Sequence, residues 1–146
     1  MLGPLTYRDI GLALMAGCVL LIVILQPRRQ EPWAPWAGAA AIALAFFCLP
    51  TQIHERYLYP ALVFLAVAAW ADRRLLSVLG LLSTTFLMNL ALVWPATPEL
   101  DALAHSVGDG PRSAIAGLNL IAMFALVGWL AISKPQPLRR PSLPVC

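Results

Sequence analysis

The chain is predicted to be an all-α integral membrane protein with about five transmembrane helices. Three observations predict this fold class. Hydrophobic residues make up 60% of the 146 residues and charged residues only 12%, the mean hydropathy is +0.78, and the apolar residues occur in long runs between short polar joints. Soluble domains carry about twice that share of charged residues. A soluble type of enzyme is therefore excluded.

The predicted spans follow from the thickness of a bilayer core, about 30 Å, which requires about 20 apolar residues in one helix. The first stretch has no small-x-small cleavage site before its polar end, so we expect a retained span rather than a signal peptide. Residues 1–133 then form one helical bundle. The prolines and paired arginines of residues 134–146 predict a disordered cytoplasmic tail. The five predicted spans are Ile10–Leu25, Ala34–Leu49, Tyr57–Ala71, Leu75–Trp94 and Ser113–Ile132.

The orientation is predicted from the basic residues of the joints. Five spans place the N-terminus, the joint at 50–56 and the loop at 95–112 on one side of the membrane. The joint at 26–33, the tight turn at 72–74 and the C-terminal tail fall on the other side, with seven basic residues against three. The positive-inside rule makes the side with seven cytoplasmic, so the N-terminus is outside. The net charge of +3 is then explained by topology, and no nucleic-acid partner is expected.

The most informative segment is the run from Thr51 to Pro60, which places His54, Glu55 and Arg56 between two apolar spans. Span two has 16 residues and reaches only about 24 Å. In span three, Pro60 disfavours an α conformation at the preceding residue, so we expect the regular helix to begin near Pro60 and the segment before it to be irregular. Irregular backbone at membrane depth is tolerated where it lines a wet cavity. The sequence therefore predicts a polar pocket that opens outward.

The chemistry of this segment suits an anionic headgroup. Arg56 carries a permanent planar cation that matches phosphate, His54 can donate a hydrogen bond or shuttle a proton, and Glu55 can orient either cation. The alternative is an interfacial joint, in which Glu55 and Arg56 neutralise each other while Tyr57 and Tyr59 anchor the membrane surface. Spacing alone leaves both interpretations open.

The run Gln52-Ile53-His54-Glu55-Arg56-Tyr57-Leu58-Tyr59-Pro60-Ala61-Leu62 resembles the His-Glu-Arg-Tyr-Leu-x-Pro-Ala-Leu signature of multi-span bacterial glycosyltransferases of the GT-C superfamily. It is also similar to the His-x-His-Glu-Lys element of the eukaryotic glucosyltransferases that extend lipid-linked oligosaccharides. The resemblance implies a hexosyltransferase in a bacterial plasma membrane that takes sugar from a polyprenyl-phosphate carrier at the external face. It implies substrate-binding roles for His54, Glu55, Arg56 and Tyr57.

The chain departs from that family in two respects. Such enzymes usually have about eight to thirteen spans, and they carry a catalytic acid in the first external loop. Here Asp9 is the only acidic residue before the first span, and its surroundings lack the paired acids of that loop. The resemblance therefore implies the C-terminal portion of such an enzyme, whose partner would be the N-terminal part or another membrane subunit. The alternative function is a small non-catalytic membrane protein that binds lipid or a membrane partner.

The external loop is predicted to contain a short interfacial helix over 98–107. Thr97 suits the N-cap and Gly108 the helix stop, and the apolar residues at 100, 103, 104 and 107 share one face. Asp101 and His105 lie one helical turn apart, but two ligands do not make a metal site. We expect no metal and no cofactor, since the sequence has no zinc-type cysteine spacing, phosphate loop or haem motif.

Several polar residues lie within the last two predicted spans. Their side chains can form hydrogen bonds between helices, and for each of them helix packing is a better explanation than substrate contact. These residues are Ser83, Thr84, Thr85, Asn89 and Asn119.

Overall fold

A computed structural model describes residues 6–26, 31–49, 55–95, 97–98, 102, 105–106 and 108–132. All regular structure in these residues is helical, which confirms the all-α class. Five helices carry the fold, and two short 3-10 turns precede two of them. In chain order the elements are α1 (Tyr7–Leu25), α2 (Ala34–Cys48), η2 (Glu55–Leu58), α3 (Tyr59–Ala71), η3 (Arg73–Leu75), α4 (Leu76–Val93) and α6 (Gly110–Ile132).

Three of the helical segments are long and apolar enough to cross a membrane. They are Tyr7–Leu25, Arg73–Val93 and Gly110–Ile132, with 19, 21 and 23 residues. The other two helices are apolar but short: α2 has 15 residues and α3 has 13, which gives lengths of about 22 and 20 Å. The structure thus supports a membrane protein. The two short helices, α2 and α3, correspond to the second and third predicted spans.

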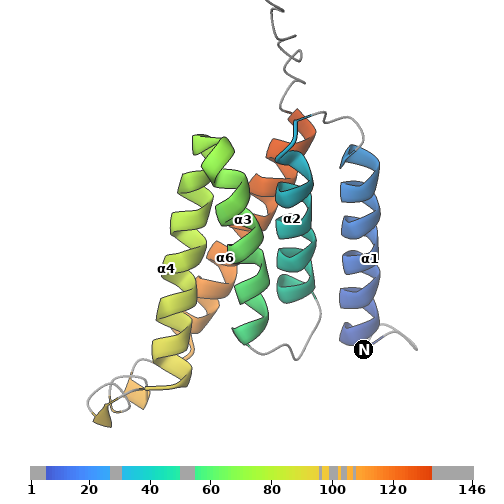
Figure 1. Cartoon of the computed structure of the whole chain (residues 1–146). Coiled ribbons are helices and arrows are strands. Elements are labelled where there is room, and N and C mark those ends of the chain that lie inside the picture. The colour runs from blue at the N-terminus through green and yellow to red at the C-terminus, as the bar shows by residue number, and fades with distance from the viewer. Residues whose placement is uncertain are drawn as a thin grey trace, which may run out of the picture.

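Successive helices run in alternating directions, so the joints gather at two opposite ends of the bundle (Figure 1). The motif end holds the start of α1, the end of α2, the start of α3, the end of α4 and the start of α6. The turn end holds the end of α1, the start of α2, the turn η3 and the end of α6. The tight turn makes α3 and α4 antiparallel neighbours, as predicted, and the two helices are in contact.

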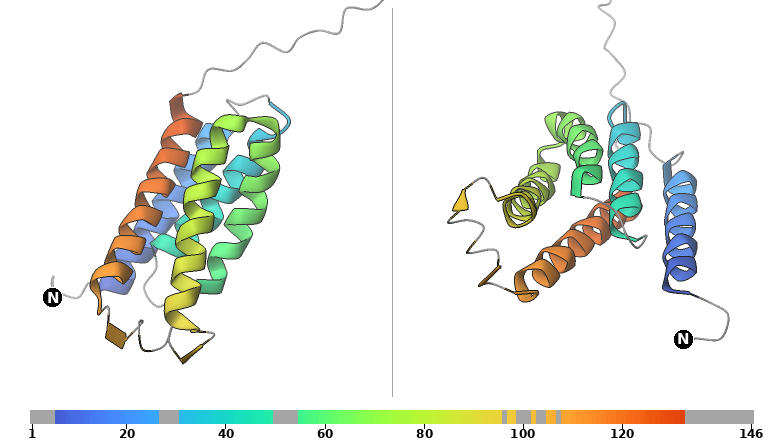
Figure 2. Two further views of the ribbon diagram at one scale, coloured as in Figure 1. Left: turned by 90° about the vertical axis from the view of Figure 1, so that its left-hand side faces the viewer. Right: turned by 90° about the horizontal axis from the view of Figure 1, so that it is seen from below.

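The centre of the bundle is α2, which packs against α1, α3 and α6. Its buried residues are small except for Leu44, and small side chains let neighbouring helix backbones approach closely. Helix α1 stands at one edge of the bundle (Figure 2), where it packs against α2 and α6. The buried residues of α2 are Ala34, Ala37, Gly38, Ala40, Ala41, Leu44 and Ala45.

Helix α1 begins at Tyr7, three residues before the predicted start of the span. The cause is a capping box. The Asp9 amide donates a hydrogen bond of 3.3 Å to Thr6 Oγ1, and the Thr6 amide donates one of 3.0 Å to Asp9 Oδ2. These bonds satisfy backbone donors that the first turn otherwise leaves without partners. Helix α6 likewise begins at Gly110 rather than Ser113.

One buried hydrogen bond joins α4 to α6. The Thr85 hydroxyl lies 2.6 Å from Asn119 Oδ1, and the two residues are only 1% and 3% exposed. This bond confirms the predicted role in helix packing for Thr85 and Asn119. The Thr84 hydroxyl instead donates a hydrogen bond of 2.9 Å to the Gly80 carbonyl of its own helix.

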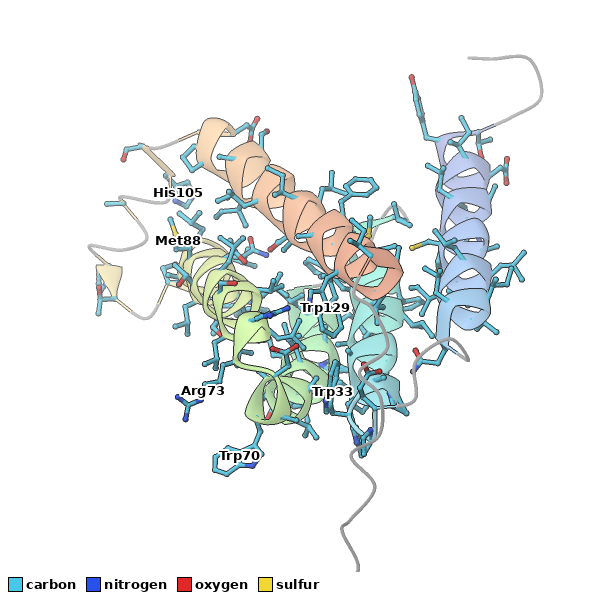
Figure 3. All side chains as sticks on the ribbon, turned by 90° about the horizontal axis from the view of Figure 1, so that it is seen from above. Trp33, Trp70, Arg73, Met88, His105 and Trp129 are labelled. Atoms are coloured by element: carbon cyan, nitrogen blue, oxygen red, sulfur yellow. The ribbon has the colours of Figure 1, made fainter. Side chains whose placement is uncertain are left out.

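Aromatic side chains tie the helices together at the turn end. The rings of Trp33 and Trp129 lie 5.1 Å apart between centroids, and Figure 3 shows the two side chains next to each other. Trp36 of α2 packs against Phe64 of α3 with centroids 6.1 Å apart. Trp33 and Trp36 therefore make contacts between secondary-structure elements.

Candidate anion-binding site at the motif end

The predicted site segment enters helix α3 through the 3-10 turn η2, Glu55–Leu58. Helix α3 then begins at Tyr59, with Pro60 in its first turn. The expectation that Pro60 would keep Tyr59 out of the helix is therefore wrong. Because η2 already supplies helical backbone before the proline, the chain enters α3 without an extended residue, and a proline in the first turn lacks only an N–H that needs no partner in the helix.

Leu58 anchors this turn to the bundle. Its side chain is 1% exposed and belongs to the hydrophobic core, and η2 packs against α2, α3 and α4. The residues on either side, Tyr57 and Tyr59, are exposed. The core contact of a single leucine therefore sets the position of the motif backbone relative to three helices.

A second contact holds the turn against the end of α2. The rings of Tyr57 and Phe46 lie 6.0 Å apart and meet at 79°, edge to face. Such a geometry is favourable because the positive edge of one ring faces the negative face of the other. Tyr57 therefore stands at the exposed edge of the motif, beside the last turns of α2.

The four predicted site residues differ in what the structure says of them. His54 lies outside the described residues, and for Glu55 and Arg56 the structure describes the backbone but not the side chains. Tyr57 is described, with 41% of its surface exposed. The anion pocket therefore stays a prediction, and so do the assigned roles of these residues.

Helix α2 ends short of its neighbours at the motif end. Helix α2 stops before the ends of α1 and α4 at the motif end, as two views of the ribbon agree (Figures 1 and 2). Its short length explains this, because α2 and α1 run side by side and α2 is four residues shorter. The chain therefore leaves α2 before it reaches the level of the ends of α1 and α4.

The described carboxylates at this end are engaged locally. Asp9 serves the capping box of α1, where its Oδ2 also accepts a hydrogen bond of 2.7 Å from the Thr6 hydroxyl. Asp109 lies 3.9 Å from Arg112 at the start of α6, where both side chains are exposed. Helix α1 packs against α2 and α6, whereas η2 packs against α2, α3 and α4. Asp9 is therefore a helix-capping residue on a different element from the motif.

The predicted interfacial helix falls mostly outside the described residues, as does Asp101. Gly108, which is predicted to end this helix, is among the described residues. Its φ is +66°, the left-handed conformation in which glycine commonly ends a helix. Within the described part of the chain, no three His, Cys, Asp or Glu side chains come together as metal ligands.

Comparison of the chain with models of protein families, with curated proteins and with solved structures finds no match. The resemblance to GT-C glycosyltransferases therefore rests on the residues from Gln52 to Leu62 alone.

Proposed function

We propose that this chain is the C-terminal portion of a GT-C type glycosyltransferase that uses a sugar linked to polyprenyl phosphate. The observation that carries the proposal is the run from His54 to Leu62, which begins a short apolar helix beside a neighbour, α2, that ends early. A charged segment that follows a helix too short to reach the ends of its neighbours is a place where a polar cavity at membrane depth can form.

In this proposal the cations of the motif bind the carrier phosphate. Arg56 offers two parallel N–H donors to one phosphate, His54 adds a further donor, and Glu55 orients them. The acceptor hydroxyl must lose a proton during transfer, and the acid that removes it is supplied by the N-terminal part or by another membrane subunit. Asp9 is not proposed for this role, since it caps α1.

The proposed orientation places the motif end at the external face of a bacterial plasma membrane. The support is the asymmetry of seven basic residues against three. The alternation of helix directions assigns the joints to the two groups as the count assumes (Figure 1). Carriers of the polyprenyl-phosphate type are used on the external face by the enzymes that the motif resembles, so charge and motif agree.

The alternative function is a non-catalytic membrane protein that binds lipid or a membrane partner. The packing of Tyr57 on Phe46 favours it, because an aromatic side chain at a helix end also serves as an interfacial anchor. Both functions share the bundle, and they differ in whether the motif binds phosphate.

The substitution Arg56→Lys distinguishes them. A lysine keeps the charge but cannot reproduce the bidentate hydrogen bonds of a guanidinium. If Arg56 binds the carrier phosphate, the affinity for polyprenyl phosphate falls roughly tenfold or more, which corresponds to one lost charge-assisted hydrogen bond. The binding is measured with the full chain in nanodiscs.

The matched control is Arg112→Lys. Arg112 is another basic residue of the motif end, half exposed and outside the motif. The proposal expects this variant to bind polyprenyl phosphate as the wild type does. Equal binding by the wild type and both folded variants would leave the motif as an interfacial joint and favour the alternative function.

A further inference from the structure

Helix α3 presents an exposed apolar stripe that runs to the turn end. Val63, Ala66, Val67 and Trp70 are all exposed, and their spacing of three, four and seven residues places them on one face. Trp70 ends the stripe with 92% of its surface exposed, in the last turn of α3. The opposite face of α3, with Ala61, Leu65 and Ala68, is in the core.

Two arginines follow the stripe directly. Arg73 and Arg74 form the turn η3 and are exposed, and neither guanidinium forms a salt bridge with another described residue. The adjacent Asp72 forms no salt bridge with either guanidinium, and its Oδ1 accepts a hydrogen bond of 3.0 Å from the Arg74 backbone amide. Figure 3 shows Trp70 and Arg73 pointing outward on the same side of the bundle.

We propose that an anionic phospholipid binds at this corner, with its headgroup phosphate at Arg73 and Arg74 and an acyl chain along the stripe of α3. The amphipathic indole of Trp70 lies at the boundary between the two parts. From the bilayer core outward, such a lipid presents an apolar chain and then an anionic headgroup. The surface presents an apolar stripe, an aromatic ring and then two guanidinium groups that form no salt bridge with a described residue.

The lipid fits this surface better than a free phosphate ion or a second copy of the chain. A free ion needs the two arginines but makes no use of the exposed stripe. A second copy that met this turn in a twofold arrangement would bring its own two arginines with a single adjacent acid, Asp72, so the contact would hold an excess of positive charge. The turn end is also the proposed cytoplasmic end, where the leaflet carries anionic lipids.

The test measures how tightly the full-length chain retains phosphatidylglycerol and phosphatidylcholine, by native mass spectrometry from detergent. The double variant Arg73→Gln/Arg74→Gln is compared with Arg8→Gln/Arg112→Gln, which removes the same charge at the motif end. Each basic residue near an anionic surface contributes about fivefold to binding, so the first variant should bind phosphatidylglycerol roughly thirtyfold more weakly. The second should keep the wild-type preference for phosphatidylglycerol over phosphatidylcholine.

Three further results decide the identity of the ligand. Trp70→Ala should weaken phosphatidylglycerol binding while Trp70→Tyr, which keeps an amphipathic ring, largely restores it. Excess inorganic phosphate should not displace the lipid. Displacement by phosphate would show an anion site instead of a lipid site. Equal losses in the two arginine variants, with helix content unchanged by circular dichroism, would show a general charge effect and overturn the proposal. The motif end is unchanged in the Arg73 and Arg74 variant, so this outcome is independent of the glycosyltransferase proposal.

Discussion

Thr85 and Asn119 are the two buried polar residues among those the structure describes, and a single hydrogen bond joins them across α4 and α6. An amide oxygen buried without a donor costs more than the bond itself contributes. The pair therefore specifies which faces of the two helices meet, because rotation of either helix would separate the two side chains.

We expect Thr85→Val to destabilise the protein by about 1 kcal/mol, the upper part of the range measured for hydrogen bonds between membrane helices. Valine keeps the shape of threonine and removes the donor to Asn119. The free energy of unfolding is measured by titration with a denaturing detergent. Thr84→Val serves as the control, since Thr84 is exposed and bonds only within its own helix, and it should change stability little. If Thr85→Val is as mild as the control, the bond does not stabilise the packing of α4 on α6.

Helix α1 combines tertiary contacts with a local stabilising device. It packs against α2 and α6, and Gly11, Ile22 and Leu25 are its buried residues. Its first turn is stabilised by the Thr6 and Asp9 capping box. Short α2, by contrast, is held by contacts with three other helices.

We expect Thr6→Ala to fray the start of α1. Loss of an N-cap costs about 1 kcal/mol, so the amide of Asp9, which donates to the Thr6 side chain and carbonyl, should exchange with deuterium roughly fivefold faster. Hydrogen exchange by mass spectrometry in detergent measures this. Arg8→Ala changes the same turn but leaves the Thr6 and Asp9 hydrogen bonds in place, so it should not accelerate deuterium exchange at the Asp9 amide. Acceleration in both variants would mean that the capping box is not what holds the turn.

At the scale of the whole molecule, the orientation in the membrane governs every proposal about the motif. The five-span arrangement predicts that seven of the basic residues belong to the joints of the turn end and three to those of the motif end. Positive charges near helix ends are retained on the cytoplasmic side during insertion. The motif end is therefore expected to face outward.

This orientation predicts the accessibility of cysteines in intact cells. In a background that carries Cys18→Ala and Cys48→Ala, a membrane-impermeant thiol reagent should label Asp109→Cys but not Cys146. Position 109 is suitable because its side chain is almost fully exposed, whereas a side chain at Gly108 would be strained at φ of +66°. Permeabilised cells provide the control, in which both positions should react. Labelling of Cys146 alone in intact cells would reverse the orientation and place the motif on the cytoplasmic side.

Much of the fold is local and could be read from the sequence. Apolar runs bounded by prolines and charges predict the helices, because a backbone in a bilayer must satisfy its own hydrogen bonds. The predicted helix ends agree with the structure where polar residues or a proline follow directly, as they do after Leu25 and Ala71. They are less accurate at Tyr7, where the pattern Thr6-x-x-Asp9 was available as a capping signal.

The arrangement of the helices could not be read in this way. Hydropathy gives all five helices the same apolar character, so it does not say that short α2 lies at the centre and long α1 at the edge. Nor does it pair Thr85 with Asn119, which are 34 residues apart. For the candidate site, the sequence by itself determined the order of His54, Glu55, Arg56 and Tyr57 and their place between two spans. Only the tertiary structure decided that Leu58 anchors their turn in the core and that Tyr57 meets Phe46, because these contacts depend on how separate helices pack together.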